Sequence, residues 1–163
     1  ARALSVGQPA PQLTFTDIDG VAANSTRYSS WVQVLTVADR ASSEKMSTWM
    51  NEVGIEVAKK HPDLRIAYLG FADMQMVPGF MRPVAEPILR HFNERSQAQQ
   101  AELYSRAGVK MDPTRTVLHL VPDWDGTYLT ALGVEDAALW RCWIVIDGKV
   151  AGQRDLLVRK EGE

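Results

Sequence analysis

The sequence of 163 residues is very poor in cysteine, because Cys142 is the single one. One thiol excludes a disulfide within the chain and any metal site built from several thiolates. Two other features are also missing. No apolar run reaches the eighteen or so residues of a membrane span. The net charge is −2 and no stripe of Lys and Arg occurs, so we expect no nucleic-acid partner.

The rest of the composition is that of one globular domain. Hydrophobic residues make up 45% and charged residues 23% of the chain, which is typical of a chain that buries a full core. No linker or internal repeat interrupts residues 1–163, so we expect a single domain. The start at Ala1, without Met and without a charged-then-apolar leader, fits a mature chain that has lost a signal peptide. Export is therefore the expectation, and a cytoplasmic location stays open.

Five short apolar segments rich in β-branched residues have the lengths of strands. They span residues 13–16, 32–38, 64–70, 116–121 and 143–146. Asp147-Gly148 follows the last of them and predicts a two-residue hairpin turn into a strand at 149–151. Strands that alternate with helices and end in a hairpin predict α/β layers around a mixed sheet.

The first predicted helix follows the strand at 32–38. Apolar residues recur at helical spacing from Met46 to Val57, which predicts one buried face. Ser42 or Ser43 is expected to cap the start, and Pro62 ends the helix.

A second long helix is expected to end near residue 107. Pro87 should kink or restart it, and its polar part at 93–100 should face solvent. A short helix is expected around residues 127–132.

Four stretches with loose motifs follow one another along the chain. They are Val6–Pro11 with the turn Asp17–Gly20, the strand and helix of 32–50, the segment Val121–Val134, and Arg141–Gly148. In this order they resemble the thioredoxin-like superfamily, in its redoxin branch of TlpA-type thioredoxins and peroxiredoxins. Residues 38–45 are most similar to YtfJ-type exported proteins of that branch. The resemblance implies a thioredoxin-like three-layer α/β fold, with a mixed central sheet, helices on both faces and a C-terminal β-hairpin.

The chain departs from this family at the active site. Aligned on the strand at 32–38, Ala41 and Glu44 fall where thioredoxins have their two cysteines, and no peroxiredoxin-type Thr-x-x-Cys occurs. Arg141 falls where thioredoxins have a cis-proline and where peroxiredoxins have an arginine that stabilises the thiolate. The resemblance thus implies the scaffold without its nucleophile.

Six polar residues should gather around the turn that the family uses as its active site. They are Asp39, Arg40, Ser42, Ser43, Glu44 and Arg141. We expect the Arg141 side chain to face this turn and to pair with Glu44 or Asp39. The set is either a capped, salt-bridged surface turn or a recognition site for a peptide, an anion or a partner protein.

Cys142 allows two interpretations. A thiolate favoured by Arg141 would make a single-cysteine peroxidase or oxidoreductase. In an apolar strand, the same residue would be a small hydrophobic side chain.

Asp17–Gly20 and Asp123–Gly126 resemble the opening of a calcium loop but lack its later ligands, so we interpret both as β-turns. We expect no metal and no cofactor.

The favoured function is a cysteine-poor binding, chaperone-like or regulatory module without dithiol redox activity, with another protein or a peptide as its partner. The alternative is an atypical thiol oxidoreductase or peroxiredoxin-like enzyme that uses Cys142, or one whose second thiol comes from a partner. The sequence leaves open the oligomeric state and whether the protein is an enzyme.

Overall fold

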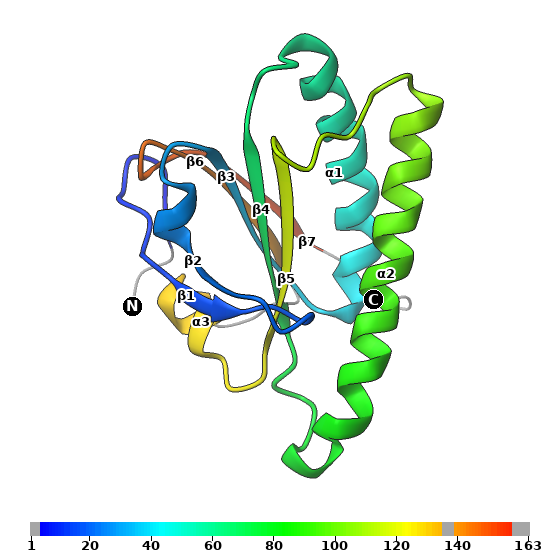
Figure 1. Cartoon of the computed structure of the whole chain (residues 1–163). Coiled ribbons are helices and arrows are strands. Elements are labelled where there is room, and N and C mark those ends of the chain that lie inside the picture. Colours follow the sequence, from blue (N-terminus) through cyan, green and yellow to red (C-terminus); the bar gives the residue numbers. More distant parts are fainter. Residues whose placement is uncertain (1–3, 135–138, 158–163) are drawn as a thin grey trace.

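A five-stranded mixed sheet forms the centre of the computed structural model, which describes residues 4–134 and 139–157 (Figure 1). Its strands, in chain order, are β3 (Val32–Ala38), β4 (Ile66–Asp73), β5 (Thr116–Asp123), β6 (Leu139–Ile146) and β7 (Lys149–Leu157). Their order in the sheet is β5-β4-β3-β6-β7. The first three are parallel to one another and the last two are antiparallel to their neighbours. The carboxyl ends of β3, β4 and β5 therefore lie at one edge, where β6 begins.

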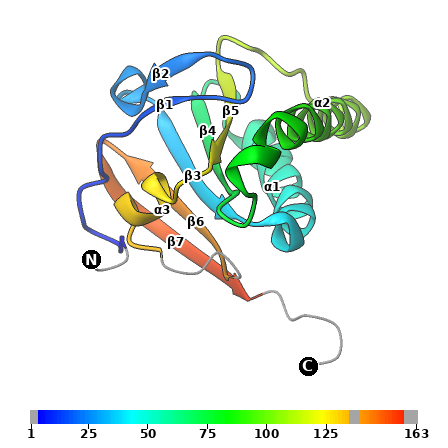
Figure 2. The same cartoon turned by 90° about the horizontal axis from the view of Figure 1, so that it is seen from below.

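Other elements cover both faces of this sheet (Figures 1 and 2). The long helices α1 (Arg40–Lys60) and α2 (Arg82–Arg106) lie on one face, with the turn η2 (Gly79–Met81) before α2. The other face carries β1 (Thr14–Thr16), β2 (Ala22–Asn24), η1 (Ser25–Tyr28) and α3 (Thr127–Ala131). The predicted three-layer α/β fold with its C-terminal hairpin is confirmed. No helix in the described part of the chain has the apolar length for a membrane crossing.

Alternating side chains of the strands build a core on each face. On β3, Leu35 and Val37 face the larger core, beneath β1 and α3, which also holds the fully buried Trp143. The indole nitrogen of Trp143 donates a hydrogen bond of 2.8 Å to the carbonyl of Leu4, which ties the N-terminal segment to the sheet. Val34 faces the smaller core beneath α1.

Most predicted elements are confirmed, with adjusted ends. The strand at 32–38 and the hairpin turn are as predicted, and Asp147 and Gly148 have φ angles of 52° and 77°, which such a turn requires. The strand predicted at 64–70 is wrong in its bounds, because β4 continues to Asp73. Of the two predicted effects of Pro87, the restart is wrong, because α2 runs without a break from Arg82 to Arg106.

The polar part of α2 does not face solvent throughout. Asn93 is buried, so the prediction for 93–100 is wrong at this position. Farther along, the hydroxyl of Tyr104 lies over Gly54 of α1. Any side chain at position 54 would overlap this hydroxyl. The face of α2 toward α1 thus uses polar side chains, which a sequence pattern based on apolar residues assigns to the surface.

Candidate functional site

The N-terminus of α1 follows β3 directly, at the sheet edge where the carboxyl ends of β3, β4 and β5 lie. Asp39 is its N-cap, and the carboxylate oxygen Oδ1 accepts a hydrogen bond of 2.9 Å from the backbone N–H of Ser42. In return, the Ser42 hydroxyl accepts one of 3.1 Å from the backbone N–H of Asp39. The two residues form a capping box. The prediction that Ser42 or Ser43 is the cap is therefore wrong, because Asp39 takes that position.

This capping box determines what the predicted site can offer to a ligand. Ser42 is buried and its hydroxyl also contacts the Asp39 carboxylate at 3.0 Å, so both side chains are engaged with each other. Glu44 is exposed and Ser43 is half-buried. The side chain of Arg40 lies outside the described residues. The structure thus brings Asp39 and Ser42 together as a helix cap, next to an exposed carboxylate.

Arg141 lies on β6, opposite Val37 of β3 and Asp155 of β7. Its Nε atom lies 3.7 Å from the Asp155 carboxylate. Within the described residues, Arg141 therefore forms its ion pair with Asp155. The predicted pairing of Arg141 with Asp39 or Glu44 is therefore wrong. The reason is that β7 extends to Leu157, so that it places a carboxylate directly across the strand pair.

Cys142 faces the smaller core, beneath α1. Its side chain is only 1% exposed. Burial raises the pKa of the Cys142 thiol to about 12, although the charge of Arg154 on the neighbouring strand acts in the opposite direction. A thiol that stays protonated and has no access to solvent lacks the properties of a redox nucleophile.

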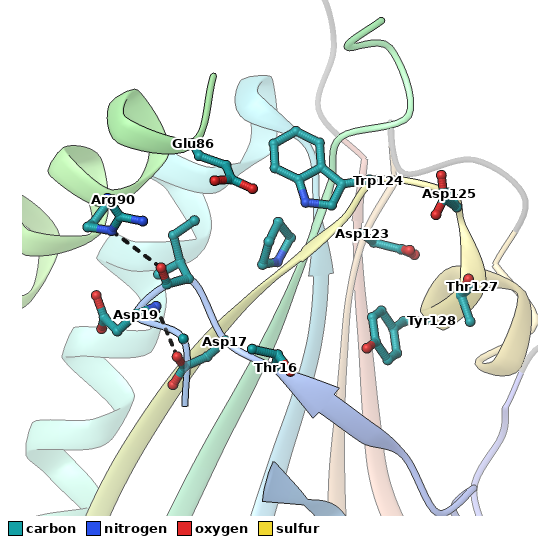
Figure 3. A pocket seen from close by; sticks show the side chains of 13 residues that line it. Thr16, Asp17, Asp19, Glu86, Arg90, Asp123, Trp124, Asp125, Thr127 and Tyr128 are labelled. Atoms are coloured by element: carbon teal, nitrogen blue, oxygen red, sulfur yellow. Dashed lines mark hydrogen bonds between the residues drawn. The ribbon is translucent and has the colours of Figure 1, made fainter. Parts of the chain in front are cut away.

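A pocket of about 500 Å³ opens at the same sheet edge, beyond the end of β5 (Figure 3). Three segments that are far apart in the sequence line it: the turn after β1, the first half of α2, and the connection from β5 to α3. Trp124 and Tyr128 provide aromatic walls, with Glu86 and Arg90 approaching from α2 (Figure 3). Sequence reasoning missed this pocket.

The two Asp-x-Asp-Gly turns, Asp17–Gly20 and Asp123–Gly126, both line it. The N–H of Gly20 donates a hydrogen bond of 3.0 Å to the carbonyl of Asp17, so the first segment is the predicted β-turn. The second segment bends from the end of β5 into α3, and Gly126, with a φ angle of 75°, is the N-cap of α3. The residues described contain no cluster of His, Cys, Asp and Glu that could hold a metal ion. The repeated motif was the one signal in the sequence that linked these two distant segments.

Backbone groups hold the first aspartate of each turn. Asp17 Oδ1 accepts hydrogen bonds of 2.9 Å from the N–H groups of Asp19 and Val21. The buried Asp123 carboxylate accepts from the first N–H groups of α3, including that of Leu129 at 2.9 Å. Burial raises the pKa of Asp123, although these hydrogen bonds act in the opposite direction. These two carboxylates thus fix the pocket walls.

A buried polar chain supports the turn after β1 from behind. His119 of β5 places Nδ1 2.7 Å from the Asp17 carboxylate and Nε2 2.7 Å from the Tyr28 hydroxyl. Because a carboxylate only accepts, Nδ1 donates, and in a neutral ring Nε2 accepts from Tyr28. All three side chains are buried, and through Asp17 this chain supports the pocket wall from behind.

The α2 wall is tied to the opposite side of the pocket by charged groups. Arg90 Nε donates a hydrogen bond of 3.4 Å to the carbonyl of Ile18. Arg82 Nη2 is 2.6 Å from the Asp125 carboxylate, and its guanidinium lies 5.5 Å from the centre of the Trp124 ring. Among the described residues, Glu86 has neither an ion pair nor a hydrogen bond. Its carboxylate is therefore available at the pocket.

Solved structures share this arrangement of strands and helices. A structure assigned to the thiol:disulfide interchange protein DsbE from Chlorobium tepidum gives a TM-score of 0.54 over 93% of this chain and 85% of its own, at 12% identity. The fold is thioredoxin-like. Peroxidoxin BcpB from Mycobacterium tuberculosis gives a TM-score of 0.53, at 16% identity. The match covers 93% of this chain and 85% of that protein. The thioredoxin domain of a thiol-disulfide oxidoreductase from Bacteroides vulgatus gives a TM-score of 0.52, at 12% identity. The match covers 93% of this chain and 89% of that domain.

These similarities show the fold and nothing finer, because all three identities are low. No protein-family model matches the chain, and the curated proteins gave no match. The neighbours are named as redox proteins, whereas this chain has one cysteine, which is buried.

Proposed function

We propose that this protein is a thioredoxin-fold binding module without thiol–disulfide redox activity, which recognises another protein or a peptide. The observation that carries the proposal is the chemistry at the start of α1. A redox protein of this fold needs a thiolate there, and the residues present are Asp39 and Ser42, closed into a capping box. A serine without an adjacent base is a weak nucleophile at neutral pH. The burial of Cys142 argues against the alternative of a single-cysteine enzyme.

The pocket beyond β5 supports a binding role. Ligands of open α/β sheets commonly bind outside the carboxyl ends of the strands, which is where this pocket lies. Its volume is that of a small-ligand site, or of a site for one side chain of a larger partner. We propose that it receives part of a partner protein, while Glu44 and the α1 turn form the neighbouring rim.

The charge of the lining favours a cationic group. Among the described residues that line the pocket, five are carboxylates and one is Arg90. Asp17 and Asp123 accept backbone hydrogen bonds and Asp125 pairs with Arg82, which leaves Glu86 and Asp19 to face a ligand. A Lys or Arg side chain could place its charge at Glu86 and its aliphatic part against Trp124.

Nuclear magnetic resonance tests this proposal directly. Three synthetic peptides of equal length, one rich in Lys and Arg, one rich in Glu and one uncharged, are titrated into the isotope-labelled protein. We expect the basic peptide to shift the backbone signals of 17–20, 86–90 and 123–128. We expect the acidic peptide to leave them unchanged.

A pair of variants on α2 separates the pocket from general charge effects. Glu86→Gln removes the available carboxylate at the pocket, and Glu94→Gln removes an exposed one from the same helix, away from it. The proposal requires that only Glu86→Gln weakens binding of the basic peptide, by about tenfold. Equal effects of the two variants, or no shifts at the pocket with any peptide, would contradict it.

The same proposal includes export. The resemblance to exported redoxins supports it. Cell fractionation of the producing organism, with an antibody against this chain, tests it, and recovery with cytoplasmic markers alone would contradict it.

A further inference from the structure

An exposed apolar stripe runs along η2 and the first half of α2. Phe80 is 81% and Ile88 66% exposed, and the stripe consists of Phe80, Met81, Val84, Ile88 and Phe92. Phe80, Val84, Ile88 and Phe92 recur every four residues, and Met81 precedes Val84 by three, so they share one side of the helix. Met76, which is 93% exposed, precedes them in the loop after β4.

The charged residues of this half of α2 lie on another side. Arg82, Glu86 and Arg90 are spaced by four residues, and they face the pocket and the β5–α3 connection. Successive residues of a helix are rotated by about 100° around its axis. Ile88, two residues after Glu86, therefore points to nearly the opposite side of the helix. The stripe therefore faces away from the pocket.

The stripe is additional to the apolar residues that pack inward. Ala85 and Leu89 are half-buried and serve the contact with the rest of the chain. A helix on the surface of a monomer ordinarily presents polar residues on its outer side. The outer side of α2 is apolar from Phe80 to Phe92, and the titratable residues near it are His91 and, beyond Phe92, Arg95. The described structure thus leaves a second apolar face of α2 uncovered.

We propose that this stripe is the interface of a homodimer, in which the first halves of two α2 helices cross in antiparallel orientation. The exposed fractions of the five stripe residues correspond to an apolar surface of roughly 500 Å² per copy, given the size of such side chains. That lies toward the upper end of the about 300–600 Å² of the largest apolar patch on a typical monomer, a kind of patch that is often functional. It supplies more than half of the roughly 800 Å² that each partner buries in a standard interface.

The stripe is suited to pairing with itself. Val84, Ile88 and Phe92 form one row of four-residue spacing, and two such rows interdigitate when helices cross at about −50°. A two-fold axis through Ile88 places the two Ile88 side chains together and the small Val84 against the large Phe92 of the second copy. No like charges meet, because Arg82, Glu86 and Arg90 lie on the other side of each helix and the two-fold axis keeps the two Arg95 side chains at opposite ends of the contact. A partner with a different sequence would have to supply this complementarity separately.

Sedimentation velocity over a wide concentration range measures the assembly. We expect the wild-type chain to have the mass of two copies, and Ile88→Glu to weaken dimerisation by about a hundredfold or more, because it would bury two unpaired charges. Val6→Glu changes an apolar residue that is 60% exposed, far from α2 in the sequence, and should leave the dimer intact. Circular dichroism establishes that the variants are folded.

Cysteine cross-linking tests the geometry. The native Cys142 is buried, so an introduced thiol reacts without background. We expect Ile88→Cys to form a disulfide-linked dimer under mild oxidation. Gln97→Cys, which is exposed on the opposite side of the same helix, should not. A wild-type protein with the mass of one copy at every concentration would overturn the proposal and leave the stripe to a different partner. A dimer that survives Ile88→Glu, or equal cross-linking at 88 and 97, would overturn it too.

Discussion

Asp39 and Ser42 bind each other across the first turn of α1, each accepting a hydrogen bond from the backbone N–H of the other. In a redox protein of this fold, the same helix end stabilises a thiolate. Here two polar side chains use the free N–H groups, and no thiol lies on the turn from residue 39 to 44. The helix terminus thus has a structural role.

The capping box should contribute to stability. We expect Asp39→Ala to lower the free energy of unfolding by about 1 kcal/mol, because the N–H of Ser42 loses its acceptor. Urea denaturation measures this change. The control is Ser105→Ala, at an exposed position of α2, which should change the value by less than about 0.5 kcal/mol. Equal effects of the two variants would show that the cap is not formed in solution.

Cys142 should make stability depend on pH in the alkaline range. Its pKa is raised from an ordinary 9.0 to about 12 in the folded protein, so the unfolded chain loses this proton first. The stabilisation is fully present below pH 9 and is lost as the pH rises toward 12. We expect the free energy of unfolding to fall more steeply between these values in wild type than in Cys142→Ala. Identical slopes, measured by denaturation at several pH values, would mean that the thiol is accessible.

The packing of α1 against α2 depends on Gly54. An ideal Cβ at this position would overlap the Tyr104 hydroxyl and lie 3.2 Å from that of Tyr68. We expect Gly54→Ala to destabilise the protein by about 1–3 kcal/mol, although alanine is the better helix former. The double variant with Tyr104→Phe removes the overlapping oxygen and should recover part of the loss. If thermal denaturation shows Gly54→Ala to be as stable as wild type, the helices are not this close.

The start of α1 should accept the cysteines that it lacks. Residues 41 and 44 lie three apart in the helix, with Cα atoms about 5 Å from each other, which is within disulfide range. We expect Ala41→Cys with Glu44→Cys to lose two titratable thiols under mild oxidation. Ala41→Cys with Thr48→Cys, two turns apart, should keep them. Failure of the first pair in folded protein would show that positions 41 and 44 do not match the two cysteine positions of thioredoxins.

The sequence predicted the centre of the fold better than its edges. The β-branched run of 32–38 and the Asp147-Gly148 turn depend on local residue preferences, and both were predicted correctly. The pairing of Arg141 was not, because it depends on how far β7 continues beside β6. The burial of Asn93 is not predicted either, because it depends on how α2 packs against the rest of the chain. These features arise from tertiary contacts, which one sequence does not display.

The pocket shows the same limit. The prediction of a β-turn is confirmed for Asp17–Gly20, but the positions of both Asp-x-Asp-Gly segments in space depend on β5 lying at the edge of the sheet. Glu86 and Arg90 complete the pocket from a helix whose orientation no local pattern reveals. The capping box was within reach of the sequence, since Asp is as good an N-cap as Ser.

The central claim is that this thioredoxin-like protein performs no thiol redox chemistry. The most direct test compares the redox activity of the wild type with that of a variant that lacks its one cysteine. Reduction of insulin disulfides and consumption of hydrogen peroxide are measured for wild type and Cys142→Ser, against a heat-inactivated sample. We predict that both proteins match the inactivated sample in both assays. Turnover by wild type that disappears in Cys142→Ser would contradict the account and make the protein a single-cysteine enzyme.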